Sequence, residues 1–459
     1  MSPGPLRRAL GSRFLRDSTV LQLGSLSISG FGFLGTLALT HVLGAVRQGE
    51  FYLAVAAYSL LWFCLNLGLV PVTISQVARS LGEGREEDAG RWLGYLAKVG
   101  APLAVLTFLA GSFGAPALLS LWVRSGEADA HLIGRCVGIL SVAPVLELPR
   151  VVALAGLEGS RRMATVARIE NGQELLRVVL VVSGALWTGD AVGPCVGTVI
   201  ASLLGSLLAL DLWARERSSG LLTLPPAREI LRLGWRAPWG LGLRLGIKVG
   251  IIRNIDALGV QILPALILGR FASPRWVAYL RIALRLVDVG RLFMKGISRT
   301  ALPVLSQLAS VRDLRGLRRV YWRATIGSGV LIGAGLLATA LVLRPALRSF
   351  LPQDYLHPVW VSFLILLPGT AVVGFSVAND TFYLVTGQLR MAIWISATGL
   401  VINTAVLVFA CWRWPDYGAA AGLSFTFLWS LVHVSYAALW FRRHRATIDG
   451  AGGLSVAQA

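Results

Sequence analysis

Six ionisable residues recur at helical spacing within one apolar segment of the sequence, at 276–307. They follow one another at intervals of 4, 3, 3, 4 and 4 residues: Arg281, Arg285, Asp288, Arg291, Lys295 and Arg299. At about 100° per residue, a helix places all six within about 120° of arc. Five bases and one acid leave this face strongly positive. Guanidinium groups bind phosphate oxygens through paired N–H donors, so the spacing predicts a face that binds an anionic group.

The elements that carry these charges are apolar enough to cross a membrane. Of 459 residues, 55% are hydrophobic and 14% charged, with a mean hydropathy of +0.68, whereas soluble domains carry about 25% charged residues. Backbone groups in hydrocarbon must be satisfied within the segment, so the spans are expected to be helices. The sequence predicts an all-α integral membrane protein with twelve spans near 18–43, 51–77, 92–122, 132–157, 167–188, 191–213, 239–269, 276–307, 324–346, 356–386, 389–412 and 418–441.

Basic residues indicate the orientation of these spans. With both termini in the cytoplasm, the inner loops hold about three times as many arginines as the outer loops. The inner arginines include those at 79–91, 215–236 and 312–323. The net charge of +20 is therefore explained by topology and lipid headgroups, and nucleic acid is not expected as a partner. The expected location is a bacterial cytoplasmic (inner) membrane.

The two halves of the chain resemble each other. A shift of 225 residues places Leu43 and Gly44 on Leu268 and Gly269. We therefore expect two six-helix lobes, related by a pseudo-two-fold axis along the membrane normal. The predicted parts are an N-terminal lobe, a cytoplasmic linker, a C-terminal lobe and a disordered tail, at 1–213, 214–238, 239–445 and 446–459.

The stripe on 276–307 has a structural alternative. Its ends, Arg281 and Arg299, can reach the two interfaces while Arg285 or Arg291 neutralises Asp288. That alternative accounts for the charges at the two ends of the stripe better than for those in its middle. Charges within a membrane are costly and usually functional, so Arg285, Arg291 and Lys295 are predicted to line a cavity.

Other charges within predicted spans leave two interpretations open. Arg244 and Lys248 lie one turn apart, and either contact cargo or extend to an interface. Asp256 forms an i, i+3 pair with Arg253 that looks self-neutralising and structural.

The fourth, tenth and twelfth spans also carry ionisable groups. Glu147 and Arg150 are spaced i, i+3 in a stretch that contains Pro144 and Pro149, which suggests either a bent helix that lines a cavity or a buried ion pair. Asp380 and His433 are isolated, and each serves either proton coupling or a hydrogen-bonded core.

One stretch resembles a known transporter family. Leu43 to Gly84 resembles the opening of the polysaccharide and O-antigen flippases, which belong to the multidrug/oligosaccharidyl-lipid/polysaccharide exporter superfamily. The shared elements are Leu43-Gly44, Gly49, Phe51-Tyr52, Leu67-Gly68-Leu69 and Ala78-Arg79. The resemblance implies a V-shaped pair of six-helix lobes, and a cargo of lipid-linked oligosaccharide on undecaprenyl pyrophosphate that moves from the inner to the outer leaflet.

The sequence departs from two branches of that superfamily. The multidrug branch commonly carries a coupling carboxylate in its first helix, and 18–43 has no Asp or Glu. The lipid II branch has fourteen spans, whereas twelve are predicted for this chain. A basic cavity suits a pyrophosphate, whereas a cationic drug would prefer an acidic site, so a multidrug or small-molecule antiporter is the alternative function.

Enzymatic functions fit the sequence less well. A membrane glycosyltransferase or polymerase needs a sizeable outer loop, and the outer loops are short. There is no GxxxxGK[ST] phosphate loop. The cysteines show no metal or redox spacing, so no cofactor or metal is expected: Cys64, Cys136, Cys195 and Cys411. The expected partners are the lipid-linked cargo, membrane lipids and other polysaccharide-assembly proteins.

Overall fold

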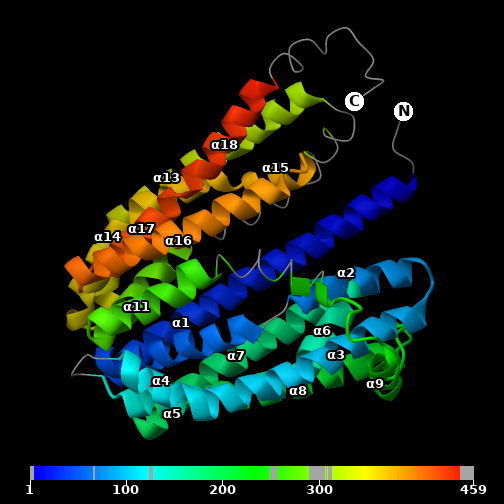
Figure 1. Cartoon of the computed structure of the whole chain (residues 1–459), viewed down its shortest axis with the longest axis horizontal. Helices are drawn as coiled ribbons and strands as arrows, with labels where there is room; N and C mark the ends of the chain where they lie inside the picture. The colour runs from blue at the N-terminus through cyan, green and yellow to red at the C-terminus, as the bar shows by residue number, and fades with distance from the viewer. Residues whose placement is uncertain are drawn as a thin grey trace. The chain divides into compact units, whose positions relative to one another are not determined.

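The computed structural model of the chain is built from helices (Figure 1). It describes residues 5–65, 68–123, 128–244, 246–247, 250, 255, 257–288, 305, 308 and 313–444. Within these ranges every regular element is helical, and the predicted all-α membrane fold is confirmed.

Eight helices in the described ranges have the length and composition to cross a membrane. They are Leu26–Phe63, Glu86–Trp122, Ala130–Gly159, Val192–Ser218, Leu314–Phe350, Gln353–Val385, Leu389–Arg413 and Gly418–Arg443. Leu26–Phe63 overlaps the first two predicted spans, 18–43 and 51–77. It belongs to α1 (Pro5–Leu65), which is kinked between those spans at Gly44, where φ is 71° and ψ is 170°. A shorter apolar helix, Leu258–Phe271, lies in the predicted seventh span.

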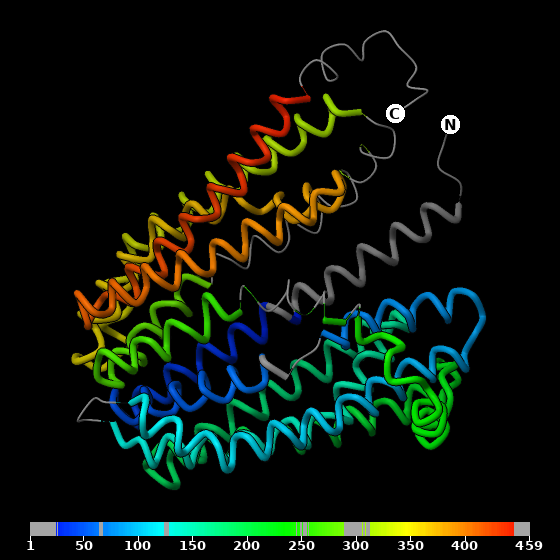
Figure 2. Tube along the Cα trace, in the orientation of Figure 1, coloured from blue at the N-terminus to red at the C-terminus, as the bar shows by residue number. Residues whose placement is uncertain are grey.

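The chain divides into two compact units (Figure 2). Unit 1 is Met1–Ile262 with Ser273–Arg275, and unit 2 is Leu263–Ala272 with Trp276–Ala459. The segment predicted as a linker, 214–238, belongs to unit 1 and is largely helical. The predicted tail at 446–459 lies outside the described residues.

Within the described residues, unit 1 contains α1 and ten further helical elements. They are α2 (Leu69–Gly82), α3 (Glu86–Leu109), η1 (Ala110–Gly114), α4 (Ala115–Trp122), α5 (Ala130–Leu140), α6 (Ala143–Gly159), α7 (Met163–Thr188), α8 (Val192–Ser218), α9 (Ala227–Arg236) and η2 (Leu258–Ile262). Small residues let α7 and α8 approach closely, as in other membrane helix pairs. A Cβ on Gly184 would lie 2.3 Å from the Gly193 carbonyl oxygen.

Unit 2 contains α11 (Leu263–Phe271), a helix over 276–288 and the elements that follow. They are α13 (Leu314–Phe350), α14 (Gln353–Val373), η3 (Gly374–Ser376), α15 (Asn379–Val385), α16 (Leu389–Arg413), α17 (Gly418–Leu428) and α18 (Ser430–Arg443). Its core at one end is aromatic. The rings of Tyr321, Phe382 and Phe441 lie 5.4–5.5 Å apart and join α13, α15 and α18.

Several predicted spans are interrupted rather than continuous. The second breaks at Gly68, whose φ of 62° is left-handed and whose backbone faces Gly250 too closely for a side chain. The fourth breaks between α5 and α6 at 141–142, the tenth at η3, and the twelfth at Trp429. Such breaks persist in membranes where neighbouring groups satisfy the freed backbone.

Candidate functional site

A partly buried cluster of charged and polar residues joins three helices of unit 1. Glu147 and Arg150 lie on α6, and Arg150 Nη2 is 3.2 Å from Glu147 Oε2. The other carboxylate oxygen, Oε1, accepts hydrogen bonds from Ser202 Oγ of α8 at 2.8 Å and from Gln173 Nε2 of α7 at 3.3 Å. We call these four residues the Glu147 cluster. The i, i+3 pair predicted from the sequence is thus brought together and joined to two other helices.

The Glu147 cluster retains unused hydrogen-bonding capacity. Arg150 Nε and Gln173 Oε1 are both buried and lack a hydrogen-bond partner. The side chains of Arg150 and Glu147 are 17% and 28% exposed. Buried polar groups in native proteins are almost always satisfied, so this donor and this acceptor remain available to a water, an ion or a polar ligand group.

The cluster lies next to a break in the fourth span. The sequence suggests a helix bent by Pro144 and Pro149. The interruption instead precedes both, at Ser141–Val142, and α6 continues through Pro149. Ser141 Oγ donates to the Gly138 carbonyl at 2.6 Å, which satisfies one backbone group at the break. Glu147 therefore begins the second turn of a new helix, on a continuous and rigid segment.

In unit 2, aromatic contacts position the helix over 276–288. The rings of Tyr279 and Tyr355 lie 5.2 Å apart, and those of Trp276 and Tyr417 lie 4.8 Å apart, so this helix is held against α14 and the start of α17. Its apolar face is fully buried at Ile282, Ala283 and Val287.

Three residues of the predicted basic stripe lie on that helix. Arg285 is half-buried, and its Nε is fully buried with no hydrogen-bond partner. Arg281 and Asp288 are also half-buried, and each interacts with another group. The other members of the stripe lie outside the described residues: Arg291, Lys295 and Arg299.

The remaining predicted site residues are more scattered. Arg244 is exposed, while Lys248 and Asp256 lie outside the described residues. Asp380 is exposed in the first turn of α15. His433 Nδ1 is 3.0 Å from the Tyr383 hydroxyl, within the aromatic core of unit 2.

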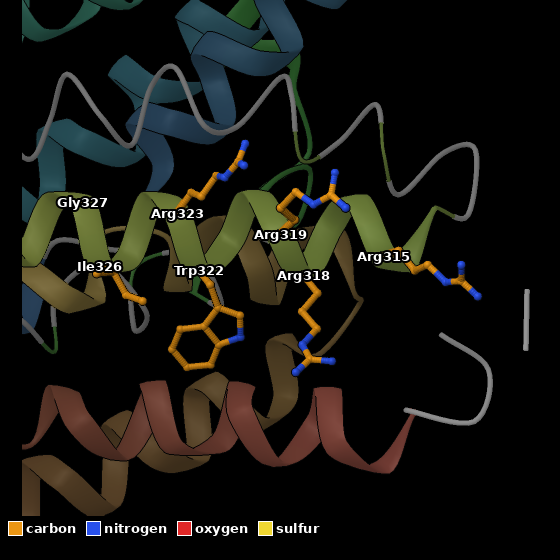
Figure 3. Close-up of a pocket in the computed structure, with 7 residues that line it drawn as sticks. All are labelled: Arg315, Arg318, Arg319, Trp322, Arg323, Ile326 and Gly327. Atoms are coloured by element: carbon orange, nitrogen blue, oxygen red, sulfur yellow. The ribbon is translucent and has the colours of Figure 1, made fainter. Parts of the chain in front are cut away.

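The start of α13 carries a cluster of arginines that, in the sequence, indicated only the topology. A hollow of about 620 Å³ is lined by Arg315, Arg318, Arg319, Trp322, Arg323, Ile326 and Gly327. Figure 3 shows Arg319 and Arg323 on one side of α13, and Arg318 with Trp322 on the other. Within the described part of the chain, no ion pair includes Arg318, Arg319 or Arg323. The sequence pattern that could have predicted this basic hollow is the i, i+1, i+5 spacing of the three arginines beside Trp322.

The fold is shared with solved membrane transporters. The chain is similar to an inward-facing multidrug resistance MATE family transporter of the MOP superfamily, with 15% identity, 95% and 96% coverage of the two chains and a TM-score of 0.66. It is similar to the lipid II flippase MurJ in an inward closed conformation, with 11% identity, 91% and 86% coverage and a TM-score of 0.67.

A third similar structure is a MOP superfamily transporter from Pyrococcus furiosus, with 15% identity, 94% coverage of both chains and a TM-score of 0.53. No family model matches the chain, and no curated protein matches its sequence. At these identities the likeness establishes the fold alone.

Proposed function

We propose that this chain is a transporter that moves a lipid-linked oligosaccharide, carried on undecaprenyl pyrophosphate, from the cytoplasmic to the outer leaflet. The observation that carries the proposal is Arg285. Its guanidinium Nε is buried without a partner, on a helix that the aromatic contacts hold firmly in unit 2. A buried guanidinium N–H without an acceptor is costly, and a phosphate oxygen is the acceptor that a guanidinium group binds best.

The sequence extends this basic face beyond Arg285. Arg291 and Lys295 follow at helical spacing, and would supply further counter-charges to a pyrophosphate. The polyprenyl tail would stay in the surrounding lipid while the charged group passes through the protein. The arginines of α13 would attract the headgroup from the cytoplasmic leaflet before it enters.

The similarity to solved structures supports a transporter of this superfamily and leaves the cargo open. One similar structure is a lipid II flippase, and another is a multidrug transporter. In the Pyrococcus furiosus transporter, the reverse polarity of the binding pocket suggests a different function. The charge of the binding pocket is therefore relevant to the choice of cargo among transporters with this fold.

A small-molecule antiporter is the second candidate, and the Glu147 cluster favours it. A buried carboxylate with spare hydrogen-bonding capacity beside it can take up a proton or a cation. In this mechanism Glu147 would couple an ion gradient to export, whereas the basic face of unit 2 would be structural.

Deletion of the gene distinguishes the two candidates. A flippase deletion should leave sugar-loaded carrier on the inner leaflet and abolish the surface polymer, with drug sensitivity unchanged. An antiporter deletion should increase drug sensitivity and leave the polymer normal. Normal surface polysaccharide in a strain without a second flippase would contradict the proposal.

A further inference from the structure

The short helix α9 differs in direction from the long helices of unit 1. Figures 1 and 2 show α9 nearly end-on, whereas α3 and α8 run across the page. It packs on α3 near Gly94, eight residues after α3 begins at Glu86. At 1.5 Å per residue, that point is about 12 Å from the start of α3. The basic loop that precedes α3 is predicted to be cytoplasmic, so α9 is expected near the inner membrane surface.

Polar contacts fix the C-terminal end of α9 to α3. Lys98 Nζ donates to the carbonyl oxygens of Trp235 and Ala237 at 3.0 and 2.7 Å, and lies 4.7 Å from the centre of the Trp239 ring. The Tyr95 hydroxyl donates to the Trp239 carbonyl at 2.6 Å. A lysine that binds the last carbonyls of a helix also opposes its negative dipole end. The position of α9 is therefore set by specific contacts.

The packed face of α9 is narrow. Ile230 is 4% exposed, and Gly234 is buried against Gly94. On the rest of the surface, large apolar side chains remain uncovered: Leu231 is 59% exposed, Trp235 78% and Trp239 58%. These three residues form the apolar face of the α9 segment.

Three exposed arginines accompany this apolar face. Arg228, Arg232 and Arg236 recur every four residues along α9 and are all exposed. The only acid on α9 is Glu229. Within the described residues, no ion pair includes any of the three arginines.

We propose that α9 is an interfacial binding surface for anionic phospholipid headgroups of the cytoplasmic leaflet. Trp235, Trp239 and Leu231 insert at the boundary between headgroups and acyl chains, while the three arginines bind lipid phosphates. Tryptophan beside arginine on one short helix matches the chemistry of that boundary, which is anionic at its surface and apolar below. The proposal does not depend on which cargo the chain moves.

The charge of the surface identifies anionic lipid as its occupant. A zwitterionic headgroup offers no net charge to three cations, whereas each basic residue near an anionic surface strengthens binding by several-fold. The fixed position of α9 on α3 means that lipid binding at this surface stabilises the cytoplasmic end of unit 1.

The test uses the purified full-length protein in nanodiscs of phosphatidylcholine, with or without about 30% phosphatidylglycerol. Binding of phosphatidylglycerol is measured by native mass spectrometry. The variant R228Q/R232Q/R236Q should bind it on the order of a hundredfold more weakly than wild type, since each lost arginine weakens binding about fivefold. The matched R228K/R232K/R236K variant should retain most of the affinity. The control R344Q/R348Q changes two exposed arginines of α13 that are predicted to lie on the outer side, and should bind as wild type does.

Insertion of the apolar face is tested in the same nanodiscs. Lipids brominated on the acyl chain quench nearby tryptophans, and W235F should reduce the quenched part of the fluorescence. The proposal is overturned if the Gln variant keeps wild-type affinity, if the Lys variant loses as much as the Gln variant, or if the α13 control loses as much. It is also overturned if W235F leaves quenching unchanged.

Discussion

Gly94 of α3 and Gly234 of α9 meet backbone to backbone. A Cβ on Gly234 would lie 2.1 Å from the Gly94 carbonyl carbon, and one on Gly94 would lie 2.6 Å from the Gly234 Cα. Neither contact can be relieved by turning a side chain. The approach lets Lys98 and Tyr95 reach the carbonyl groups that end α9 and the segment after it.

We expect Gly234→Ala to separate α9 from α3 and to destabilise the protein. Overpacking a tight contact costs about 1–3 kcal/mol, so the melting temperature in detergent should fall. The matched control is Gly240→Ala, six residues on, because no atom lies within 4 Å of an added Cβ there. Equal melting temperatures for the two variants would contradict the packing described.

A second prediction concerns the ion pair of α6. Arg150→Met leaves the partly buried Glu147 carboxylate with Ser202 and Gln173 as its hydrogen-bond donors within the described residues. Breaking a fully buried pair from one side costs about 3–5 kcal/mol. This pair is partly exposed, so the cost should be smaller than that, and removing both charges should cost less again. The melting temperature should therefore fall in Arg150→Met and recover in the double variant with Glu147→Gln.

The control for this experiment is an exposed pair of the same kind. Arg79 and Glu83 lie 3.0 Å apart with side chains 70% and 40% exposed. Arg79→Met should change stability by less than about 1 kcal/mol. A double variant at Glu147 and Arg150 that is no more stable than the single one would show that the two charges do not stabilise each other.

Hydropathy predicted the membrane helices because the bilayer leaves few alternatives for an apolar segment. The breaks within the spans were harder to predict from the sequence. Gly68 interrupts the second span because its backbone meets Gly250, 182 positions later in the sequence. No local pattern contains that information, and a glycine in an apolar run is common in membrane helices.

The contacts at the candidate sites were likewise predictable from the sequence only where they are local. The i, i+3 spacing of Glu147 and Arg150 predicted their contact, since one helix turn brings them together. Ser202 and Gln173 join them from other helices, so their roles follow only from tertiary packing. Lys98 was a basic residue without an assigned role until its contacts with α9 were known.

A third prediction concerns orientation. The excess of arginine in alternate loops predicts that both termini are cytoplasmic. Alkaline phosphatase, which is active only outside the cytoplasm, should be inactive when fused after Arg445. Fused at Pro352, between α13 and α14, it should be active. A fusion at Asp190, between α7 and α8, should also be active. The opposite pattern would reverse the topology and place α9 on the outer side.

The fourth prediction tests the basic face of unit 2. Arg285→Gln should insert and express normally, because removing a buried charge lowers the cost of insertion. Transport of the lipid-linked sugar should nevertheless fall sharply, since a phosphate would lose a counter-charge in a poorly solvated site. Restoration of surface polysaccharide in a deletion strain, normalised to the amount of protein in the membrane, is the measurement.

Two further substitutions show whether charge is the property that matters. Lys295 lies ten residues beyond Arg285 in the sequence, about 15 Å along a helix, so the two could bind one headgroup at successive stages of transport. Lys295→Arg should retain more activity than Lys295→Gln, and Arg281→Gln, nearer one end of the stripe, should have a mild effect. If Arg285→Gln and Lys295→Gln reach the membrane and both restore the polymer fully, the basic face does not bind the cargo. The stripe would then be a structural ion network, with the Glu147 cluster left as the stronger candidate for transport.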